Sequence, residues 1–286
     1  MYPLTDVEVK ALTLRAEDIR ESIIKMLVEA GSGHTAGPLG MADIFTTLYF
    51  RVLKHNPRHP EWAERDRLIL SNGHIAPVLY ATMAHAGYFG VLELKTLRKF
   101  GSRLQGHPHR ESLPGLETSS GPLGCGLSQA IGMALMDRLE VHKPDRYFYC
   151  LMGDGEINEG QVWESFLLLN KYKLNKIITI IDRNTIQIDG HTEDVLPLES
   201  LKDKLESFNF HVIEIDGHNF RDIARACGAA KSSLDKPTVI IAHTIPGKGV
   251  IEFEGDFKWH GKAPNSEEGK VALRELRSLR GKISTD

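Results

Sequence analysis

Cysteine is scarce in this 286-residue sequence. Its three cysteines, Cys125, Cys150 and Cys227, show no paired spacing. This excludes a disulfide framework and a cysteine-based zinc site. We therefore expect a protein of the reducing cytoplasm.

Long hydrophobic runs and an excess of one charge are also missing. The longest apolar runs, such as 177–181, are far too short to span a bilayer, and the charged start lacks the apolar centre of a signal peptide. The formal net charge is only −3, from 35 basic and 38 acidic residues, so no basic surface is offered to nucleic acid or an anionic membrane. We expect neither a nucleic acid nor a membrane as a partner.

The pattern that is present is an alternation of strands and helices. Strands are predicted over 67–70, 147–152, 177–181, 212–215 and 238–242. Helices are predicted from a capping box at Thr5 to Gly31, and over 38–49, 77–87, 91–99, 127–142, 161–172, 198–208 and 220–234. This order predicts an α/β fold, with a parallel sheet of about five strands and helices on both faces. No linker divides the chain, and the polar tail after Trp259 is expected to be only partly ordered.

Polar or glycine-rich segments follow several of these predicted strands. In an open parallel sheet, ligands bind beyond the carboxyl ends of the strands. His74 and Asp154 follow two strands, and the loop 246–249 follows a third. We therefore expect the functional site in the loops at this one edge of the sheet.

An acid between two glycines, Asp154, stands at the end of the strand 147–152. Gly153 and Gly155 allow the backbone to approach a ligand closely, and the turn precedes a helix whose free N–H groups suit a phosphate. Asn184 ends the next strand, and one crossover brings two such strand ends together. Two protein oxygens, with phosphate oxygens and water, make an octahedral Mg²⁺ site. The pair predicts a metal-bridged diphosphate, although a Gly-Asp-Gly turn alone is most often only a turn.

This Gly-Asp-Gly…Asn stretch resembles the thiamine-diphosphate motif, and the rest of the sequence is similar to one family that carries it, the transketolases. Matching segments occur in the family's order: 31–40, 70–75, 106–108, 118–127, 154–190, 244–251 and 259–265. The resemblance implies transfer of a two-carbon ketol unit from a ketose phosphate to an aldose phosphate, as in the pentose phosphate pathway. It implies thiamine diphosphate as the cofactor, with Mg²⁺ or Ca²⁺.

The resemblance also assigns roles to individual residues. The metal ligands would be Asp154, Asn184 and the backbone carbonyl of Ile186. The residues that would bind the cofactor are His74, Gly121, Pro122, Leu123, Gly153, Asp154, Gly155, Glu159, Asn184, Ile188 and His260.

Four histidines lie in the matching segments and are the candidates for catalysis: His34, His74, His107 and His260. The resemblance places them against the thiazolium and the sugar. We expect His34 and His260 to move protons at the cleaved hydroxyl and the acceptor carbonyl, because imidazole suits this work near neutral pH. We expect His107 to contact the first hydroxyl of the donor and His74 to face the reactive carbon. The remaining histidines are expected to be structural or surface residues.

Several other positions are less specific, or depart from the family pattern. Glu159 and Glu164 would lie at a dimer interface or simply on a solvated helix, and Lys248 is a phosphate contact or a turn lysine. Cys125 stands where glutamine is common, and Arg183 stands where Asp or Asn is usual. These differences bear on substrate choice and fine geometry more than on cofactor binding.

The resemblance covers only the first of the three transketolase domains. We therefore expect residues 1–286 to form a single diphosphate-binding domain, with the pyrimidine-binding and C-terminal domains on a second subunit. The expected assembly is an α₂β₂ heterotetramer that acts on sugar phosphates, and the chain is expected to be inactive alone.

Three alternatives remain open at this point. The chain could be the α subunit of a thiamine-diphosphate 2-oxo-acid dehydrogenase, which shares the Gly-Asp-Gly…Asn motif. It could be a cofactor-binding regulatory module without catalysis, or a transketolase subunit that serves sugars outside the pentose phosphate pathway.

Overall fold

A five-stranded parallel sheet forms the centre of the molecule, which we describe from a computed structural model covering residues 3–140 and 145–285. The strand order is β1-β2-β3-β7-β6, and every neighbouring pair is parallel. The strands are β1 (Arg67–Leu70), β2 (Phe148–Gly153), β3 (Ile177–Arg183), β6 (His211–Asp216) and β7 (Thr238–His243). The predicted α/β class, strand number and parallel arrangement are confirmed.

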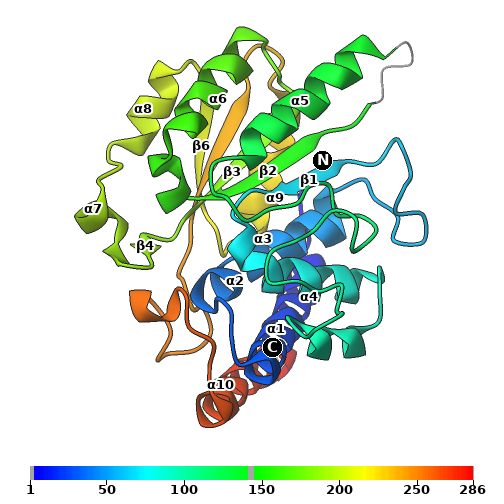
Figure 1. Ribbon diagram of the computed structural model, residues 1–286, viewed down its shortest axis with the longest axis vertical. Coiled ribbons are helices and arrows are strands. Elements are labelled where there is room, and N and C mark those ends of the chain that lie inside the picture. Colours follow the sequence, from blue (N-terminus) through cyan, green and yellow to red (C-terminus); the bar gives the residue numbers. More distant parts are fainter. Residues whose placement is uncertain (1–2, 141–144, 286) are drawn as a thin grey trace.

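Helices cover both faces of this sheet (Figure 1). On one face α5 (Gly126–Leu139), α6 (Gly160–Lys171) and α8 (Leu201–Ser207) pack on alternate strand residues in one apolar cluster. On the other face a second cluster joins the sheet to the remaining large helices, which are α1 (Asp6–Ala30), α3 (Ala42–Thr47), α4 (Ala76–Ala86) and α9 (Phe220–Ser232). Strand β3 is buried along its whole length because both layers cover it, as expected for a parallel sheet.

The shorter elements lie mainly at the carboxyl edge of the sheet or between helices. They are α2 (Ala36–Gly40), α7 (Thr192–Val195), a π-helical turn (Leu48–Val52), 3₁₀ turns at Gly73–Ile75, Val91–Thr96, Gly155–Asn158 and Phe257–Trp259, and a hairpin of β4 (Ile186–Gln187) and β5 (Gly190–His191). Sequence patterns did not predict the hairpin.

The first helix begins and ends where the sequence predicts. The Thr5 hydroxyl accepts the N–H of Glu8, and the Glu8 carboxylate accepts the N–H of Thr5 at 2.8 Å, which completes the capping box. Gly31 ends the helix with φ +63°, a left-handed conformation that costs glycine little.

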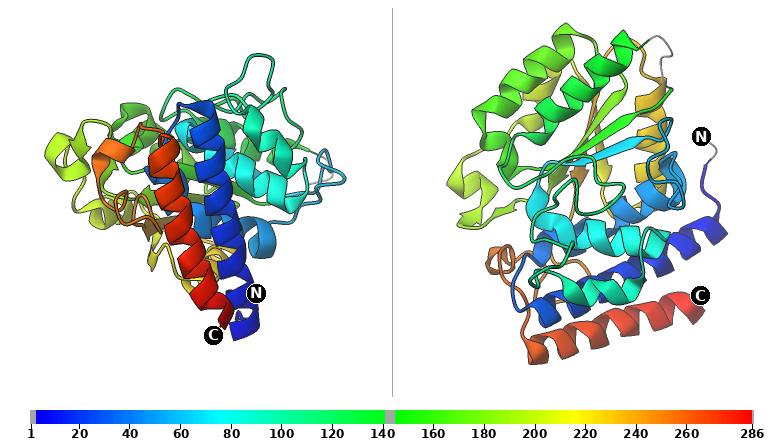
Figure 2. Two further views of the ribbon diagram at one scale, coloured as in Figure 1. Left: turned by 90° about the horizontal axis from the view of Figure 1, so that it is seen from below. Right: turned by 45° about the vertical axis from the view of Figure 1, so that its right-hand side comes forward.

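Two sequence expectations are wrong at the level of whole elements. The polar tail is folded rather than partly ordered. It forms α10 (Ser266–Thr285), which lies alongside α1 (Figure 2) and buries Ala272 and Leu276. The region 91–99 is a 3₁₀ turn over Val91–Thr96 rather than an α-helix. It ends there because Leu97 has an extended ψ of 127° and Arg98 then takes φ +59°, and no right-handed helix can continue through these residues.

Smaller differences concern helix ends. The helix predicted over 198–208 begins at Leu201, after Ser200. The helix predicted over 127–142 ends at Leu139, and positions 141 and 142 lie outside the described residues. Among the described residues, no helix is both long enough and apolar enough to cross a membrane.

Candidate active site

A cavity of about 310 Å³ opens at the carboxyl edge of the sheet. Loops that follow β1, β2 and β3 form part of its walls, and the segments that carry His34, His107 and His260 complete them. Its lining consists of His34, Asn72, His74, His107, Gly121, Leu123, Gly153, Asp154, Gly155, Glu156, Asn184, Ile186, Gln187, Ile188 and His260. Residues separated by more than 200 positions in the sequence therefore meet in one hollow.

All four candidate histidines line this cavity. The ring centres of His34 and His74 lie 4.8 Å apart, those of His74 and His260 lie 5.2 Å apart, and those of His34 and His260 lie 5.7 Å apart. His107 lines the wall beside them and is itself more exposed to solvent. The topology brings these rings together because their loops converge at one edge of the sheet.

The histidines are held in their neutral form. Burial, then the nearby His260, Arg98 and His107, lower the pKa of His34 to about 4. Burial lowers the pKa of His260, and burial followed by the neighbouring histidines lowers the pKa of His74 well below its ordinary value. Burial and Arg98 also lower the pKa of His107. Near pH 7 each ring therefore has one N–H donor and one free lone pair.

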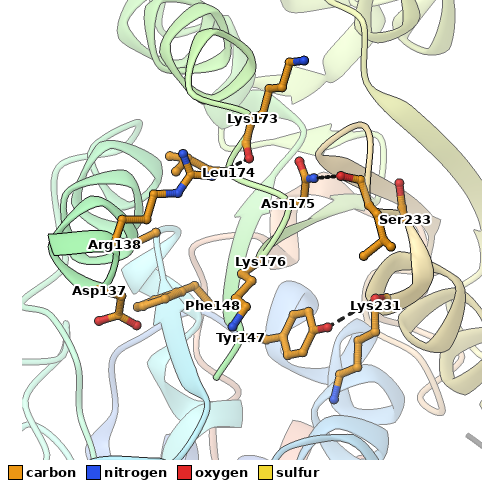
Figure 3. A pocket seen from close by; sticks show the side chains of 12 residues that line it. Asp137, Arg138, Tyr147, Phe148, Lys173, Leu174, Asn175, Lys176, Lys231 and Ser233 are labelled. Carbon is orange, nitrogen blue, oxygen red and sulfur yellow. Dashed lines mark hydrogen bonds between the residues drawn. The ribbon is translucent and has the colours of Figure 1, made fainter. Parts of the chain in front are cut away.

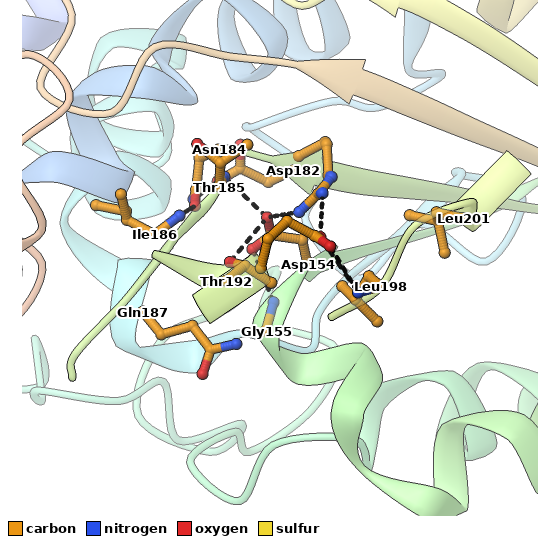
Figure 4. Close-up of polar contacts among 12 residues, drawn as sticks. Asp154, Gly155, Asp182, Asn184, Thr185, Ile186, Gln187, Thr192, Leu198 and Leu201 are labelled. Carbon is orange, nitrogen blue, oxygen red and sulfur yellow. Dashed lines mark hydrogen bonds and ion pairs between the residues drawn. The ribbon is translucent and has the colours of Figure 1, made fainter. Parts of the chain in front are cut away.

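Asp154 is anchored by a dense set of hydrogen bonds (Figure 4). It is only 1% exposed, and its Oδ1 accepts the N–H of Gly155 at 2.7 Å. Its Oδ2 accepts the N–H of Thr185 at 2.8 Å, a guanidinium N–H of Arg183 at 2.8 Å and the hydroxyl of Thr192 at 3.3 Å. Burial raises the pKa of Asp154, and Arg183 with these donors acts in the opposite direction. Oδ1 is the oxygen with more capacity left for a cation.

Asn184 is oriented by its own strand. Its Nδ2 donates to Asp182 Oδ2 at 2.8 Å, which turns its Oδ1 toward the backbone N–H of Ile186 at 3.1 Å. One lone pair of that Oδ1 remains for a metal. Asp182 is almost completely buried and also accepts the hydroxyl of Thr244, and burial raises the pKa of Asp182 to about 7.

Arg183 differs from the family pattern and has a definite place in the site. Its guanidinium pairs with Asp154 at 2.8 Å, with Glu193 at 2.6 Å and with Glu199 at 2.8 Å. The side chain is buried while the two glutamates are much more exposed. Arg183 therefore ties the candidate metal ligand to the segment that carries α7.

The cavity has free polar atoms that a ligand could use. Asn72 Oδ1, His34 Nδ1 and His260 Nδ1 are buried and have no hydrogen-bond partner in the described part of the chain. Buried polar groups are nearly always paired, so these atoms point to a bound molecule. Together with the Asp154 and Asn184 oxygens, they suit a diphosphate-bearing cofactor and an oxygen-liganded metal.

Most of the predicted cofactor residues line this cavity, but two do not. Pro122 is exposed and lies outside the lining, and Glu159 is exposed at the start of α6. Glu164 is exposed on α6, and Lys248 lies near Glu254, with 3.9 Å between Nζ and Oε1, rather than in the cavity. Cys125 is a free thiol whose Sγ lies 3.6 Å from Gln161 Nε2.

Sequence reasoning missed three lining residues, of which Glu156 is the most consequential. This buried carboxyl accepts the N–H of Gly124 at 2.7 Å, the N–H of Gly153 at 3.2 Å and the hydroxyl of Ser71. It thereby joins three loops of the cavity wall. Its position directly after the Gly-Asp-Gly turn could have identified it from the sequence as a residue of the site.

Asn72 and Gln187 are the other two. Asn72 lies within the matched segment 70–75, and Gln187 donates to Asn158 Oδ1 at 2.9 Å. Asn72 lies two positions and Gln187 six positions after a predicted strand end, in loops that the sheet argument alone would have placed near a ligand.

A second hollow of about 300 Å³ lies near the amino ends of β2 and β3 (Figure 3). The described residues of its lining include Phe148 and Lys176 but no histidine, and Arg138 donates to the backbone carbonyl of Lys173 at 2.6 Å. Its polar groups are largely bound to the protein itself, so the histidine-lined cavity is the candidate active site.

The fold and the site together define a diphosphate-binding domain of the thiamine-diphosphate type: a parallel sheet with an acid–asparagine pair at adjacent strand ends, below a histidine cluster. A family model described as "Transketolase, thiamine diphosphate binding domain" matches residues 13–279. The chain belongs to the transketolase family, as its N-terminal, thiamine-diphosphate-binding part.

Curated relatives of similar length are named as separate subunits. The chain is 39% identical over 270 residues to one subunit of an apulose-4-phosphate transketolase from Phocaeicola vulgatus, covering 94% of this chain and 95% of that protein. It is 40% identical over 262 residues to "6-deoxy-6-sulfo-D-fructose transketolase subunit SqwG" of Clostridium sp. (strain MSTE9), covering 92% and 94%. The chain therefore corresponds, over nearly its whole length, to proteins that are named as single subunits of split transketolases.

A solved structure shows the relation to longer transketolases. The crystal structure of transketolase from Campylobacter jejuni superposes with a TM-score of 0.86 at 36% identity, over 94% of this chain but only 42% of that one. These comparisons favour the transketolase interpretation over the 2-oxo-acid dehydrogenase alternative.

Proposed function

We propose that the histidine-lined cavity is the cofactor half of a transketolase active site and that Mg²⁺ joins thiamine diphosphate to it. The observation that carries this proposal is the convergence of His34, His74, His107 and His260 on the same hollow as Asp154 and Asn184. A regulatory module without catalysis has no need of four neutral imidazoles around a diphosphate site.

Three oxygens of this chain would hold the metal. They are Asp154 Oδ1, Asn184 Oδ1 and the backbone carbonyl of Ile186, with diphosphate oxygens and water completing the shell. When bound, thiamine diphosphate supplies the electron sink for carbon–carbon bond cleavage. Ile188, which is 61% exposed, and Gly121 and Leu123 would contact it along the wall.

The imidazoles would move protons at the sugar. A neutral His34 or His260 accepts a proton from a hydroxyl through its free nitrogen and returns it to a carbonyl oxygen. Because the ring centres of these two histidines lie 5.7 Å apart, both cannot carry a positive charge together without strong repulsion. His34 and His260 would therefore share at most one extra proton at a time. His107 would donate a hydrogen bond to the first hydroxyl of the donor, and His74 would face the reactive carbon.

A second subunit would complete the site with the pyrimidine-binding and C-terminal domains, in an α₂β₂ assembly. Exposed apolar side chains support such an interface: Met136 and Leu139 on α5 are 58% and 77% exposed, and Leu167 on α6 is 62% exposed. Apolar exposure of this kind often marks a contact with another protein. The free thiols agree with a cytoplasmic location.

The test is a reconstitution assay. The purified chain is mixed with thiamine diphosphate and Mg²⁺, with and without the partner subunit, and two-carbon transfer from xylulose 5-phosphate to ribose 5-phosphate is followed. We expect transfer only in the mixture. Transfer by the chain alone would refute the two-subunit proposal, and pyruvate decarboxylation by the mixture would refute the transketolase chemistry.

A matched pair of variants tests the histidine roles. His107→Asn should retain thiamine diphosphate affinity in calorimetry but lose turnover, because this residue is proposed to contact the sugar. His59→Asn, on an exposed loop away from the cavity, should leave both unchanged. Equal losses in the two variants would contradict the assignment.

A second substrate class has specific support. The two curated relatives are named for apulose 4-phosphate and 6-deoxy-6-sulfo-D-fructose, which are not pentose phosphate pathway sugars. The same assay with these two ketoses as donors, ranked by kcat/KM against xylulose 5-phosphate, decides between the classes.

A further inference from the structure

His218, one of the histidines expected to be structural, lies outside the lining of the histidine-lined cavity but makes two specific contacts. It stands in the turn between β6 and α9, and its side chain is only 13% exposed. Its Nε2 accepts the backbone N–H of Ile245 at 2.8 Å, and its Nδ1 lies 2.7 Å from Asp43 Oδ2. Because a backbone N–H can only donate, the ring proton is on Nδ1 and points to Asp43. The two contacts therefore fix both the tautomer and the orientation of the ring.

On one side, the ring of His218 is held by a buried group of charged side chains. Asp43, on α3, is 4% exposed and also accepts a guanidinium N–H of Arg20 at 2.6 Å. Arg20, on α1, pairs in addition with Glu17 at 2.8 Å and donates to the carbonyl of Leu39 at 3.2 Å. A hydrogen-bonded network of this kind rigidifies its members, so Asp43 is a fixed support for the histidine.

On its other side, His218 contacts the loop 244–247, which follows β7 at the carboxyl edge of the sheet. The hydroxyl of Thr244 in this loop donates to Asp182 Oδ1. The other oxygen of Asp182 accepts Nδ2 of Asn184 at 2.8 Å. The loop therefore reaches a proposed metal ligand through a single intervening carboxylate.

The loop 244–247 is fixed at both ends. At its far end, the N–H of Gly247 donates to the first carbonyl of α2 at 2.8 Å. At its near end, the N–H of Ile245 is bound by His218, while the N–H of Thr244 makes a longer bond of 3.3 Å to the carbonyl of Arg183. His218 thus provides the shorter of the two contacts beside the Thr244 hydroxyl.

We propose that His218 is a positioning residue for Asn184. His218 fixes Ile245, and the adjacent Thr244 then fixes one oxygen of Asp182. The second oxygen of Asp182 turns the Asn184 amide so that its Oδ1 is left for a metal. This proposal rests on the proposed site for Mg²⁺ and thiamine diphosphate, because only a metal ligand needs this orientation. Hydrogen bonds that orient a ligand from outside typically change metal affinity about ten- to hundredfold.

Two conservative substitutions separate the two contacts of the ring. In His218→Gln, the side-chain Oε1 can take the place of Nε2 and accept the N–H of Ile245. In His218→Asn, the amide is one bond shorter, so Nδ2 can still donate to Asp43 but no atom reaches Ile245. His243→Asn at the end of β7 is the matched control, because that ring is 54% exposed and contacts Glu214 at 3.0 Å instead of the loop.

The first readout is hydrogen exchange of the Asn184 side-chain amide, followed by NMR in the isolated chain without metal. In wild type this amide is protected by its bond to Asp182. We expect exchange about three- to tenfold faster in His218→Asn, the effect of weakening a neutral hydrogen bond. His218→Gln should be much closer to wild type, and His243→Asn should match it. Equal rates in the two His218 variants would overturn the proposal, because the contact with Ile245 would then have no separate role.

A double-mutant cycle tests the path through the loop. Thr244→Val removes the hydroxyl that reaches Asp182 with little change of shape, whereas Thr244→Ser keeps it. Thr244→Val should speed exchange of the Asn184 amide, and Thr244→Ser should not. Adding His218→Asn to Thr244→Val should cause no further change, since both act on the same contact. Additive effects would contradict this path. Unchanged exchange in Thr244→Val would do so as well, whether or not His218→Asn folds.

The second readout is calorimetry of thiamine diphosphate binding in the presence of Mg²⁺, with the chain assembled with its partner subunit. We expect affinity about ten- to hundredfold lower in His218→Asn and Thr244→Val. It should be close to wild type in His218→Gln, Thr244→Ser and His243→Asn. Unchanged affinity in His218→Asn would overturn the proposal. If the wild-type complex binds no thiamine diphosphate, the proposed function fails, and the exchange measurement still decides whether His218 positions Asn184.

Discussion

Replacing Glu156 with glutamine is expected to destabilise the chain in a way that depends on pH. Glutamine has the same shape, and its Oε1 can still accept from Gly124 and Ser71. Its amide nitrogen then faces the N–H of Gly153, which in wild type donates to the carboxyl at 3.2 Å. A buried donor without an acceptor costs about 1–3 kcal/mol. We therefore expect the free energy of unfolding to fall by this amount at pH 5.

The pH dependence follows from the pKa of Glu156. Burial raises it from 4.5 to about 7, against the hydrogen bonds from Ser71, Gly124 and Gly153, which lower it. The folded chain therefore holds this proton more tightly than the unfolded chain, and wild-type stability falls as pH rises from about 4.5 to about 7. That pKa difference corresponds to about 3 kcal/mol. Glutamine cannot titrate, so the difference in unfolding free energy between wild type and variant should shrink or vanish at pH 8. The pKa of Asp182 is also raised to about 7. Asp182 is present in both proteins, so its contribution to the pH dependence cancels when the two are compared.

The assay is urea unfolding of the isolated chain followed by circular dichroism, at pH 5 and pH 8, with EDTA present so that no metal contributes. Glu164→Gln on the exposed face of α6 is the control and should unfold like wild type. A Glu156→Gln variant that matches the control at pH 5 would refute the hydrogen-bond reasoning. A loss of equal size at both pH values would refute the titration reasoning.

Further predictions concern the metal site and the fit of the loops. Asp154→Asn should abolish calorimetrically detectable Mg²⁺-dependent binding of thiamine diphosphate, as EDTA should in wild type, because the proposed carboxylate ligand is lost; binding that survives would exclude Asp154 as a ligand. Arg183→Met should weaken that binding about ten- to hundredfold, the usual effect of removing a group that orients a ligand; unchanged affinity would show that the 2.8 Å pair with Asp154 is dispensable. Gly126→Ala should lower the free energy of unfolding by about 1–3 kcal/mol, because its Cβ would lie 2.4 Å from Ser71 Cβ. Gly132→Ala on the same helix has open space and should stabilise by about 0.5–1 kcal/mol; similar unfolding curves for the two glycine variants would contradict the packing argument.

Patterns along the chain were sufficient to predict the fold class and the edge of the sheet at which the site lies. Buried strands such as 177–181 are continuous apolar runs, because a parallel sheet covered on both faces needs no polar alternation. Chain order then places Asp154 and Asn184 at neighbouring strand ends, since a crossover returns each parallel strand to the same edge. The tail was misjudged for a local reason: the apolar residues of α10 are few, and only the neighbouring α1 shows that Ala272 and Leu276 have a surface to pack on.

Contacts between distant loops determine which side chains hold the site together, and these contacts could not be predicted. Glu156 and Arg183 look like ordinary charges in the sequence, but the fold buries both, and a buried charge must find partners. The fold gives Glu156 the N–H groups of two loops, and Arg183 three carboxylates. Gly33 and Arg98 likewise come into contact across 65 positions of sequence, since a Cβ built on Gly33 would lie 3.8 Å from Arg98 Nε. Periodicity and spacing describe neighbours along the chain, and such partnerships arise only when distant loops converge.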